Sequence, residues 1–265
     1  MIALWNAGVL MSHQLDMAAL KRKLRRAEGA GEFVQSTRML LMEGQVSKAR
    51  SVARMAIERF PRRYQASYDD LGVCEWLLGN KAAAIEAWRG GLHTAYRDPA
   101  GGVYSRSNLW WGGAMSGDRA VVREALGHLE SALTSLRATN WPGPMARYVV
   151  GRISEKKLLE AAQDVDRCLE GDRITRESLL VVGAKAFQEG NLDRARACFA
   201  RCADGLVDAL GEHRNNKLLM AGYELSKLDA AAKLPVRKRR HAKGDRKRRN
   251  GLAEKSKSNR KRGQA

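Results

Sequence analysis

Two distant stretches of the chain share one pattern of bulky, small and turn residues. The pattern is a bulky residue, an apolar residue followed by glycine, a Gly-Asn pair, an alanine and an aromatic residue. Its first copy consists of Tyr68, Leu71, Gly72, Gly79, Asn80, Ala84 and Trp88. Its second copy, at the same offsets, consists of Leu179, Val182, Gly183, Gly190, Asn191, Ala195 and Phe199. Each copy predicts two helices joined by a Gly-Asn turn, packed closely where the small residues lie.

Partial copies of this plan fill the remainder of the chain up to residue 230. Gly44 precedes Gly79 by thirty-five residues, close to the length of one helix-turn-helix repeat. The predicted repeat domain covers residues 30–230, with units at about 30–64, 65–98, 103–136, 141–170 and 176–209 and a capping helix at 215–228. A basic N-terminal helix is predicted within residues 1–29, and residues 231–265 form a C-terminal tail.

The sharpest feature outside the repeats is the segment Asn140-Trp141-Pro142-Gly143-Pro144. Its two prolines fix backbone angles that a helix interior does not accept. The segment therefore predicts a turn into the next helix, with Trp141 folded over the joint. A recognition role for Trp141 is the alternative.

The repeated residues resemble the tetratricopeptide repeat, whose unit combines a large residue, Leu-Gly, a turn glycine, an alanine, an aromatic residue and a terminal proline. The resemblance is good in two units and partial elsewhere. It implies an all-α fold, a right-handed α-solenoid whose concave groove binds a partner peptide or helix. At the groove-facing offsets stand Arg38, Met42, Asp69, Trp76, Trp111, Met115 and Phe187, with Leu41, Leu180 and Ala184 beside them. A purely packing role is open for each of these residues, and Trp88 falls at the aromatic core position.

Composition supports the all-α prediction and separates the charge from the fold. Hydrophobic residues make up 44% of the 265 residues and aromatic residues only 6%, which favours packed helices over a β-sandwich or a disordered chain. The formal charge is +19. Residues 235–265 hold fourteen Lys or Arg against two acidic residues, so +12 of this charge belongs to the tail. The tail has no apolar periodicity, which predicts disorder.

The tail also predicts attraction to a polyanion, because neutralised phosphates release condensed counterions. Its first clusters are Arg237, Lys238, Arg239, Arg240, Arg246, Lys247, Arg248 and Arg249. No aromatic residue is interleaved, so contact with RNA or DNA would be electrostatic and weakly sequence-specific. A nuclear-import signal in a eukaryotic cell and a merely solvated extension are the alternatives.

No arrangement of residues indicates catalysis, so we predict that the protein is not an enzyme and uses no cofactor. The five histidines lie in unrelated contexts, without a metalloprotease or nucleophile-elbow motif. Cys198, Cys202 and His213 have a spacing at which a metal site can be imagined. However, Cys202 fills the small-residue position of the repeat and Cys198 adjoins Phe199, so we expect packed thiols and no metal.

The cysteines and the N-terminus bear on localisation. The four cysteines form no disulfide framework, which favours a reducing compartment, cytoplasmic or, in a eukaryote, nuclear. The apolar stretch Met1 to Met11 is too short to span a bilayer and lacks a basic n-region, so neither a signal peptide nor a membrane span is predicted. Met11 is an alternative start.

Two functions of different class follow. The leading hypothesis is a non-catalytic scaffold that holds a partner protein in its groove, without membrane attachment. The alternative is a nucleic-acid-associated protein whose repeats position the basic tail, and an enzyme is a distant third.

Overall fold

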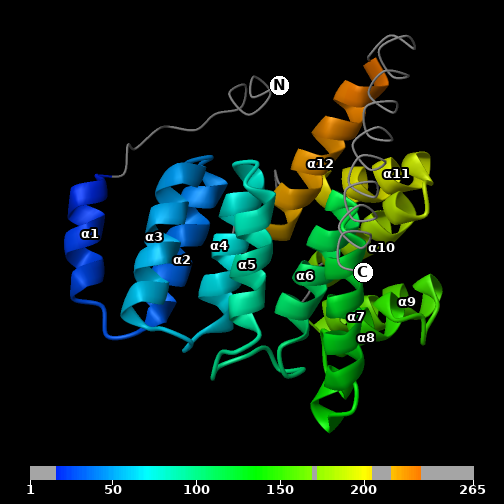
Figure 1. The fold of residues 1–265 in the computed structure, drawn as a ribbon, viewed down its shortest axis with the longest axis horizontal. Coiled ribbons are helices and arrows are strands. Elements are labelled where there is room, and N and C mark those ends of the chain that lie inside the picture. The colour runs from blue at the N-terminus through cyan, green and yellow to red at the C-terminus, as the bar shows by residue number, and fades with distance from the viewer. Residues whose placement is uncertain (1–15, 169–171, 205–215, 234–265) are drawn as a thin grey trace, which may run out of the picture. The chain divides into compact units, whose positions relative to one another are not determined.

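The computed structural model describes residues 16–168, 172–204 and 216–233. Within these ranges the fold has twelve α-helices, one short 3-10 helix and no β-strand, which confirms the all-α prediction (Figure 1). The chain divides into two units, residues 1–225 and residues 226–265. The first unit holds α1 to α11 and the first ten residues of α12.

The helices follow one another closely along the chain. Their bounds are α1 Met17–Arg25, α2 Ala30–Met42, α3 Val46–Arg59, α4 Gln65–Leu77, α5 Lys81–Gly91, α6 Val103–Ser116, α7 Arg119–Ala132, η2 (the 3-10 helix) Leu136–Thr139, α8 Gly143–Val149, α9 Glu155–Cys168, α10 Arg173–Gln188, α11 Leu192–Ala203 and α12 Asn216–Lys233. Each predicted unit thus contains one pair of helices, and a helix forms over the predicted cap.

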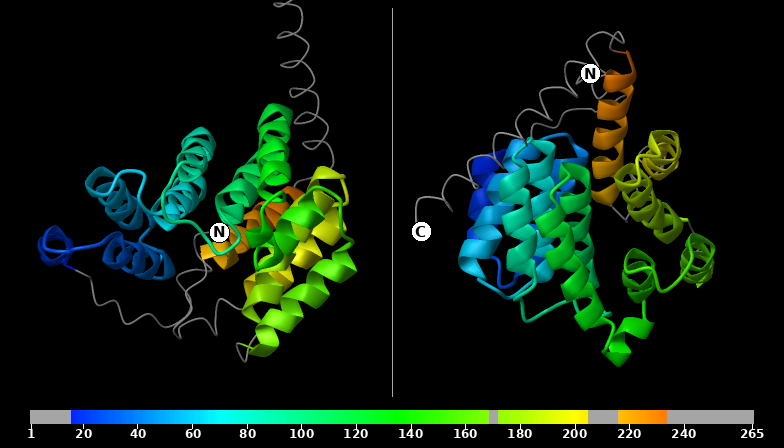
Figure 2. Two further views of the ribbon diagram at one scale, coloured as in Figure 1. Left: turned by 90° about the horizontal axis from the view of Figure 1, so that it is seen from below. Right: turned by 45° about the vertical axis from the view of Figure 1, so that its right-hand side comes forward.

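Neighbouring helices pack as pairs, α2 with α3, α4 with α5, α6 with α7 and α10 with α11. The first helices of the pairs also contact one another, α2 with α4, α4 with α6 and α6 with α10. Figure 2 shows α2, α4 and α6 forming one layer and α3, α5 and α7 another. This stacking is repeat-like, because each pair buries its apolar stripe against its neighbours. The right-handed course of a solenoid remains a prediction.

Close helix approach within a pair depends on glycine at two matched positions. A Cβ atom at Gly72 would lie 2.1 Å from Nε1 of Trp88, and one at Gly183 would lie 2.6 Å from Cε1 of Phe199. Both rings are fully buried. The sequence prediction that these glycines let the second helix approach the first is therefore confirmed.

The turns of the same two pairs require glycine for a different reason. Gly79 and Gly190 each adopt a φ of 83°, a left-handed conformation that residues with a Cβ rarely accept. These glycines end α4 and α10 and reverse the chain into α5 and α11.

Three tryptophans form the centre of the core between α4, α5 and α6. The ring centroids of Trp76 and Trp111 are 4.8 Å apart, and Trp88 lies 5.9 Å from the first and 6.2 Å from the second. All three side chains are at most 1% exposed. Aromatic pairs at such separations stabilise a core beyond the area that they bury. The predicted core role of Trp88 is confirmed.

The proline-rich segment forms the predicted turn. The Trp141–Pro142 peptide bond is cis, and α8 begins at Gly143. The indole N–H of Trp141 donates a hydrogen bond to the hydroxyl oxygen of Tyr104 at 3.1 Å. Trp141 therefore ties the turn to α6.

Several predictions concern residues that lie outside the described ranges. These are the stretch Met1 to Met11, His213 and residues 234–265 of the predicted tail. Residues 231–233, predicted as the start of the tail, instead continue α12 as a helix. Among the helices that are described, none is both long enough and apolar enough to cross a membrane.

Candidate helix-binding surface

The first half of α12, Asn216–Leu225, packs on side chains from α4, α6 and α10. Its residues Leu218, Leu219, Met220 and Ala221 are all buried. These apolar side chains make one face of α12 hydrophobic, and that face is buried against the other helices. Figures 1 and 2 show the first half of α12, in orange, beside α6 and α10. We call the faces of α4, α6 and α10 that α12 covers the inner surface.

Two polar contacts hold this helix at separate points. The indole N–H of Trp76 on α4 donates a hydrogen bond to Oε1 of Glu224 at 2.8 Å. The ammonium group of Lys217 donates a hydrogen bond to Oε1 of Glu177 on α10. Lys217 and Glu224 are seven residues apart, two helical turns or about 10 Å, so they lie on one face of α12. The face toward the inner surface thus carries a cation at one end and a carboxylate at the other.

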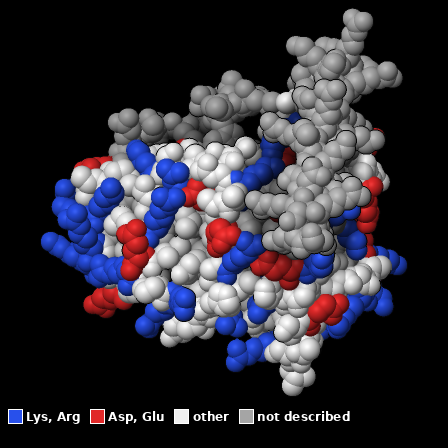
Figure 3. Space-filling model, in the orientation of Figure 1, with Lys and Arg blue, Asp and Glu red and all other residues white. Residues whose placement is uncertain are grey.

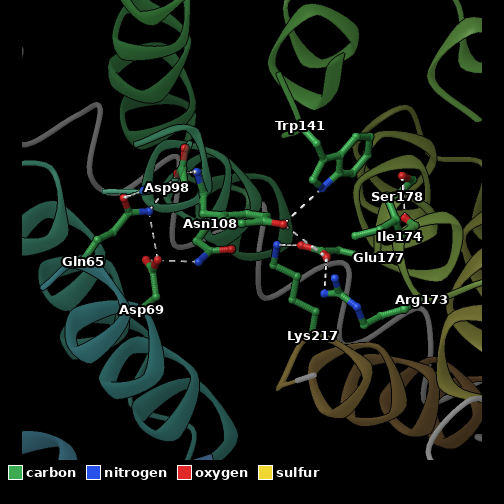
Figure 4. Close-up of polar contacts among 11 residues, drawn as sticks. Gln65, Asp69, Asp98, Asn108, Trp141, Arg173, Ile174, Glu177, Ser178 and Lys217 are labelled. Carbon is green, nitrogen blue, oxygen red and sulfur yellow. Dashed lines mark hydrogen bonds and ion pairs between the residues drawn. The ribbon is translucent and has the colours of Figure 1, made fainter. Parts of the chain in front are cut away.

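The Lys217 end is built around the ring of Tyr104. Figure 4 shows the side chains of Lys217, Glu177 and Arg173 pointing toward one another there. The ammonium nitrogen lies 3.5 Å from the centroid of the Tyr104 ring, a cation–π distance. The Tyr104 hydroxyl donates to Oε2 of Glu177 at 3.4 Å while it accepts the N–H of Trp141. Arg173 also approaches Oε2 of Glu177, at 4.0 Å. Four segments of the chain therefore converge on one carboxylate and one ammonium group.

A second buried carboxylate, Asp69 on α4, lies beside this cluster. Ser105 donates to its Oδ1 at 2.6 Å, Asn108 donates to the same atom at 3.3 Å, and Gln65 donates to Oδ2 at 3.1 Å. Figure 4 shows that Gln65 also bridges to Asp98. Burial raises the pKa of Asp69 to about 6, although the hydrogen bonds from Ser105 and Gln65 oppose that shift.

The charges of Lys217 and the acidic inner surface compensate one another. Burial lowers the pKa of Lys217 well below its ordinary value, and the carboxylates of Asp69 and Asp98 act in the opposite direction. Lys217 is 7% exposed and Glu177 only 2%. A buried charge is tolerated only beside a partner of opposite sign, and Lys217 and Glu177 are such partners.

The predicted groove residues divide into a buried and a partly exposed set. The buried set is Asp69, Trp76, Trp111 and Met115, and the partly exposed set is Arg38, Met42 and Phe187. Two of the buried residues, Asp69 and Trp76, belong to or adjoin the contact with α12. Arg38 instead joins α2 to α4, since its Nε donates to Asp70 Oδ2 at 3.0 Å.

Trp111 behaves as a core residue. It packs on Trp76 and Trp88, and its buried indole N–H has no hydrogen-bond partner among the described residues. Replacing Trp76 and Trp111 by alanine would empty the core. That pair of substitutions is therefore unsuited to testing partner binding.

Sequence reasoning missed Tyr104, Glu177 and Lys217, although two of them carried a signal. Glu177 interrupts an apolar helix face formed by Ile174 and Val181, and Lys217 precedes the buried run from Leu218 to Ala221. A charged residue on a face that must be buried predicts an internal partner of opposite charge. The pattern cannot say which residue that partner is.

The cysteine pair on α11 is packed in the core. Cys198 is 2% exposed and Cys202 is fully buried, and burial raises the pKa of the Cys202 thiol. The structure places no three His, Cys, Asp or Glu side chains as a metal site within the ranges it describes. The thiols thus fill space beside Phe199, while His213 lies outside those ranges.

Comparison with known proteins adds no assignment. No protein-family model matches the chain, and no curated protein matches it with significant similarity. The likeness to the tetratricopeptide repeat therefore depends on the residues and offsets of the chain itself.

Proposed function

We propose that this protein is a non-catalytic scaffold of tetratricopeptide-like repeats that binds a helix of a partner protein on its inner surface. One observation carries the proposal: the inner surface already holds a helix, Asn216–Leu225, through side chains of α4, α6 and α10. A surface that recognises a helix of its own chain has the shape and chemistry to recognise another.

The chemistry of the inner surface favours binding over catalysis. Its charged groups are buried and neutralise one another, as Lys217 does with Glu177. Tyr104 is held in its neutral form, because burial raises its pKa to about 12. A catalytic site needs a nucleophile or base with access to substrate, whereas these groups are engaged in holding helices together.

The alternative function, nucleic-acid binding through the tail, remains a prediction from the sequence. One observation is compatible with it. Lys21, Arg22, Lys23 and Arg25 on α1, and Arg26 directly after it, are all exposed. Figure 3 shows Lys and Arg side chains gathered at that end of the molecule. A basic surface of this kind adds attraction to a polyanion but no sequence selectivity.

Site-specific photo-crosslinking in cells tests the proposed function. The photoreactive amino acid p-benzoylphenylalanine replaces one of two partly exposed residues at predicted groove positions. They are Met42 at the end of α2, the helix that packs against α4, and Phe187 in the last turn of α10. The matched control carries it at Arg123, an exposed residue of α7 in the other layer. Crosslinked products are identified by mass spectrometry.

We expect crosslinking at Met42 and at Phe187 to recover the same partner protein, and crosslinking at Arg123 not to recover it. The segment recovered from that protein should be an amphipathic helix. Products that are equal at all three positions, or that consist of nucleic acid alone, would contradict a helix-binding scaffold.

A further inference from the structure

The ammonium group of Lys217 lies in a cage made by one aromatic ring and one carboxylate. Its nitrogen lies 3.5 Å from the Tyr104 ring centroid and donates to Glu177 Oε1. Cation–π attraction and a charge-assisted hydrogen bond are the two interactions that best replace the water lost by a buried ammonium group. The cage therefore satisfies this group from two sides.

The walls of the cage are positioned independently of Lys217. The Tyr104 hydroxyl accepts the N–H of Trp141 at 3.1 Å and donates to Glu177 at 3.4 Å, which fixes ring and carboxylate together. Arg173, one turn before Glu177 on α10, lies 4.0 Å from the same carboxylate. A site whose walls are already oriented loses little conformational entropy when its ligand enters.

The geometry suits a primary ammonium group better than other cations. A guanidinium group is a plane that binds carboxylates with two parallel hydrogen bonds, and here Oε2 of Glu177 is engaged by Tyr104. A quaternary ammonium group can lie over the ring but has no N–H to donate to Oε1. The carboxylates of Asp69 and Asp98 add attraction for a compact positive charge.

We propose that Tyr104 and Glu177, supported by Trp141, form a recognition site for a primary ammonium group, occupied by Lys217 in the free protein and by a lysine of the partner helix in the complex. The second half of this inference rests on the proposed function, whereas the first half does not. Tyr104 and Trp141 are only partly buried. Exchange of one lysine for another at this cage requires that the first half of α12, with its buried residues Leu218 to Ala221, leave the inner surface.

Two polar residues of α12 also define what the partner helix should carry. Lys217 and Glu224 both face the inner surface, seven residues apart, with Met220 and Ala221 between them. A partner helix that replaces α12 should present a lysine and, two turns later, an acceptor for the Trp76 N–H, with an apolar and a small residue between them.

Chemical rescue tests the ammonium site on the full-length chain. Lys217→Ala removes the part of the side chain that n-propylammonium reproduces, from Cγ to the ammonium nitrogen. We expect n-propylammonium to raise the Tm of this variant by about 3–6 °C at roughly ten times its dissociation constant. Wild type, whose cage is occupied, should show no rise beyond that caused by equal ionic strength.

Three controls separate recognition from general salt or packing effects. Lys217→Met fills the space with an apolar chain and should not respond to the amine. The neutral analogue n-propanol and the quaternary propyltrimethylammonium should not rescue Lys217→Ala. Adding Glu177→Gln to Lys217→Ala should abolish the rescue, because the ammonium group then loses the carboxylate that accepts its hydrogen bond.

If Lys217→Ala does not fold in buffer, the protein is refolded from urea at increasing amine concentrations, and the recovery of helical circular dichroism is measured instead of the Tm. Rescue by the primary amine alone supports the ammonium site. Equal effects of n-propylammonium, n-propanol and the quaternary amine, or no effect of any, would overturn it. Rescue in the absence of any crosslinked partner would instead refute the proposed function and leave the ammonium site standing.

Discussion

The contact between Gly72 and Trp88 yields the sharpest prediction about the fold. A Cβ at position 72 would lie 2.1 Å from Nε1 of Trp88 and 2.5 Å from Cδ1 and Cε2. Ordinary contact between such atoms needs about 3.5 Å, so the indole or α5 must move by more than about 1 Å. In Gly72→Ala this movement is resisted on all sides.

The indole of Trp88 cannot escape the added methyl group. It is fully buried, its ring packs against those of Trp76 and Trp111, and a Cβ at Gly112 on α6 would already be only 2.6 Å from its Cζ3. Its N–H also donates to the backbone carbonyl oxygen of Asp69 at 3.3 Å, a hydrogen bond that the displacement would break.

The magnitude follows from three opposing effects. Overpacking costs about 1–3 kcal/mol and here approaches the upper end, because the overlap exceeds about 1 Å. Loss of the Trp88 hydrogen bond costs about 1 kcal/mol. The better helix propensity of alanine returns about 1 kcal/mol. We therefore expect Gly72→Ala to lower the free energy of unfolding by about 2–3 kcal/mol.

Urea unfolding followed by far-UV circular dichroism and tryptophan fluorescence measures the effect. The matched control is Gly127→Ala on α7, where no atom lies within 4 Å of the added methyl group, and it should stabilise by about 0.5–1 kcal/mol. Combined with Trp88→Leu, the cost of Gly72→Ala should fall by at least about 1 kcal/mol. If Gly72→Ala is as stable as Gly127→Ala, the packing argument is wrong.

Three further predictions concern the inner surface and the tail. Because burial raises the pKa of Asp69 to about 6, its folded form holds a proton between about pH 4 and 6 that the unfolded chain has lost, and the stability it gives falls as pH rises through 6. From pH 4 to 7, the unfolding free energy of wild type should thus fall by about 2 kcal/mol relative to that of Asp69→Asn. The charged groups that act on Asp69 from nearby are Asp70 and Lys217. Parallel pH profiles of the two proteins would exclude a raised pKa for Asp69. Trp76→Phe keeps a ring but loses the hydrogen bond to Glu224, so amide hydrogen exchange in Asn216–Leu225 should accelerate about tenfold, while unchanged exchange would show that the contact does not hold α12. Full-length protein should bind duplex DNA with an affinity that falls steeply between about 50 and 200 mM salt. A chain ending at Leu234, which keeps only the basic surface of α1, should bind much more weakly. Equal binding by both lengths would remove the tail from the interaction.

The helix pairs could be predicted because they depend on local periodicity and on a few small residues. Gly72 and Gly183 precede Trp88 and Phe199 by the same sixteen residues, and the structure places each glycine against its ring. Such a pair is encoded within one unit of the repeat. It needs no knowledge of distant parts of the chain.

The position of α12 could not be predicted in the same way. Its apolar face indicates that one side is buried, but it does not say against what. The hydrogen bond between Trp76 and Glu224 joins residues 148 positions apart. A sequence pattern with a period of a few residues carries no information about contacts at that distance along the chain. The sequence therefore predicts only a helix that closes the end of the repeats, and not its contact with α4.

The complete burial of Trp76 and Trp111 could not be predicted either, because it also depends on distant parts of the chain. Repeat offsets assign these side chains to the first helices of their pairs, which the structure confirms, since they belong to α4 and α6. What covers those helices is a tertiary matter, decided by the neighbouring Trp88 and by the contact of Trp76 with α12. Local position in a repeat thus predicts the face of a helix but not its exposure.

Binding of α12 in trans tests the central claim, that the inner surface recognises a helix. A fluorescent peptide spanning Asn216–Lys233 is titrated with full-length protein in which Lys217→Ala and Glu224→Ala weaken the helix of the chain itself. Fluorescence anisotropy should show saturable binding at least tenfold tighter than to wild-type protein, and a peptide with the same two substitutions should bind at least tenfold more weakly. Equal binding of both peptides, or no binding of either to the variant, would contradict the account.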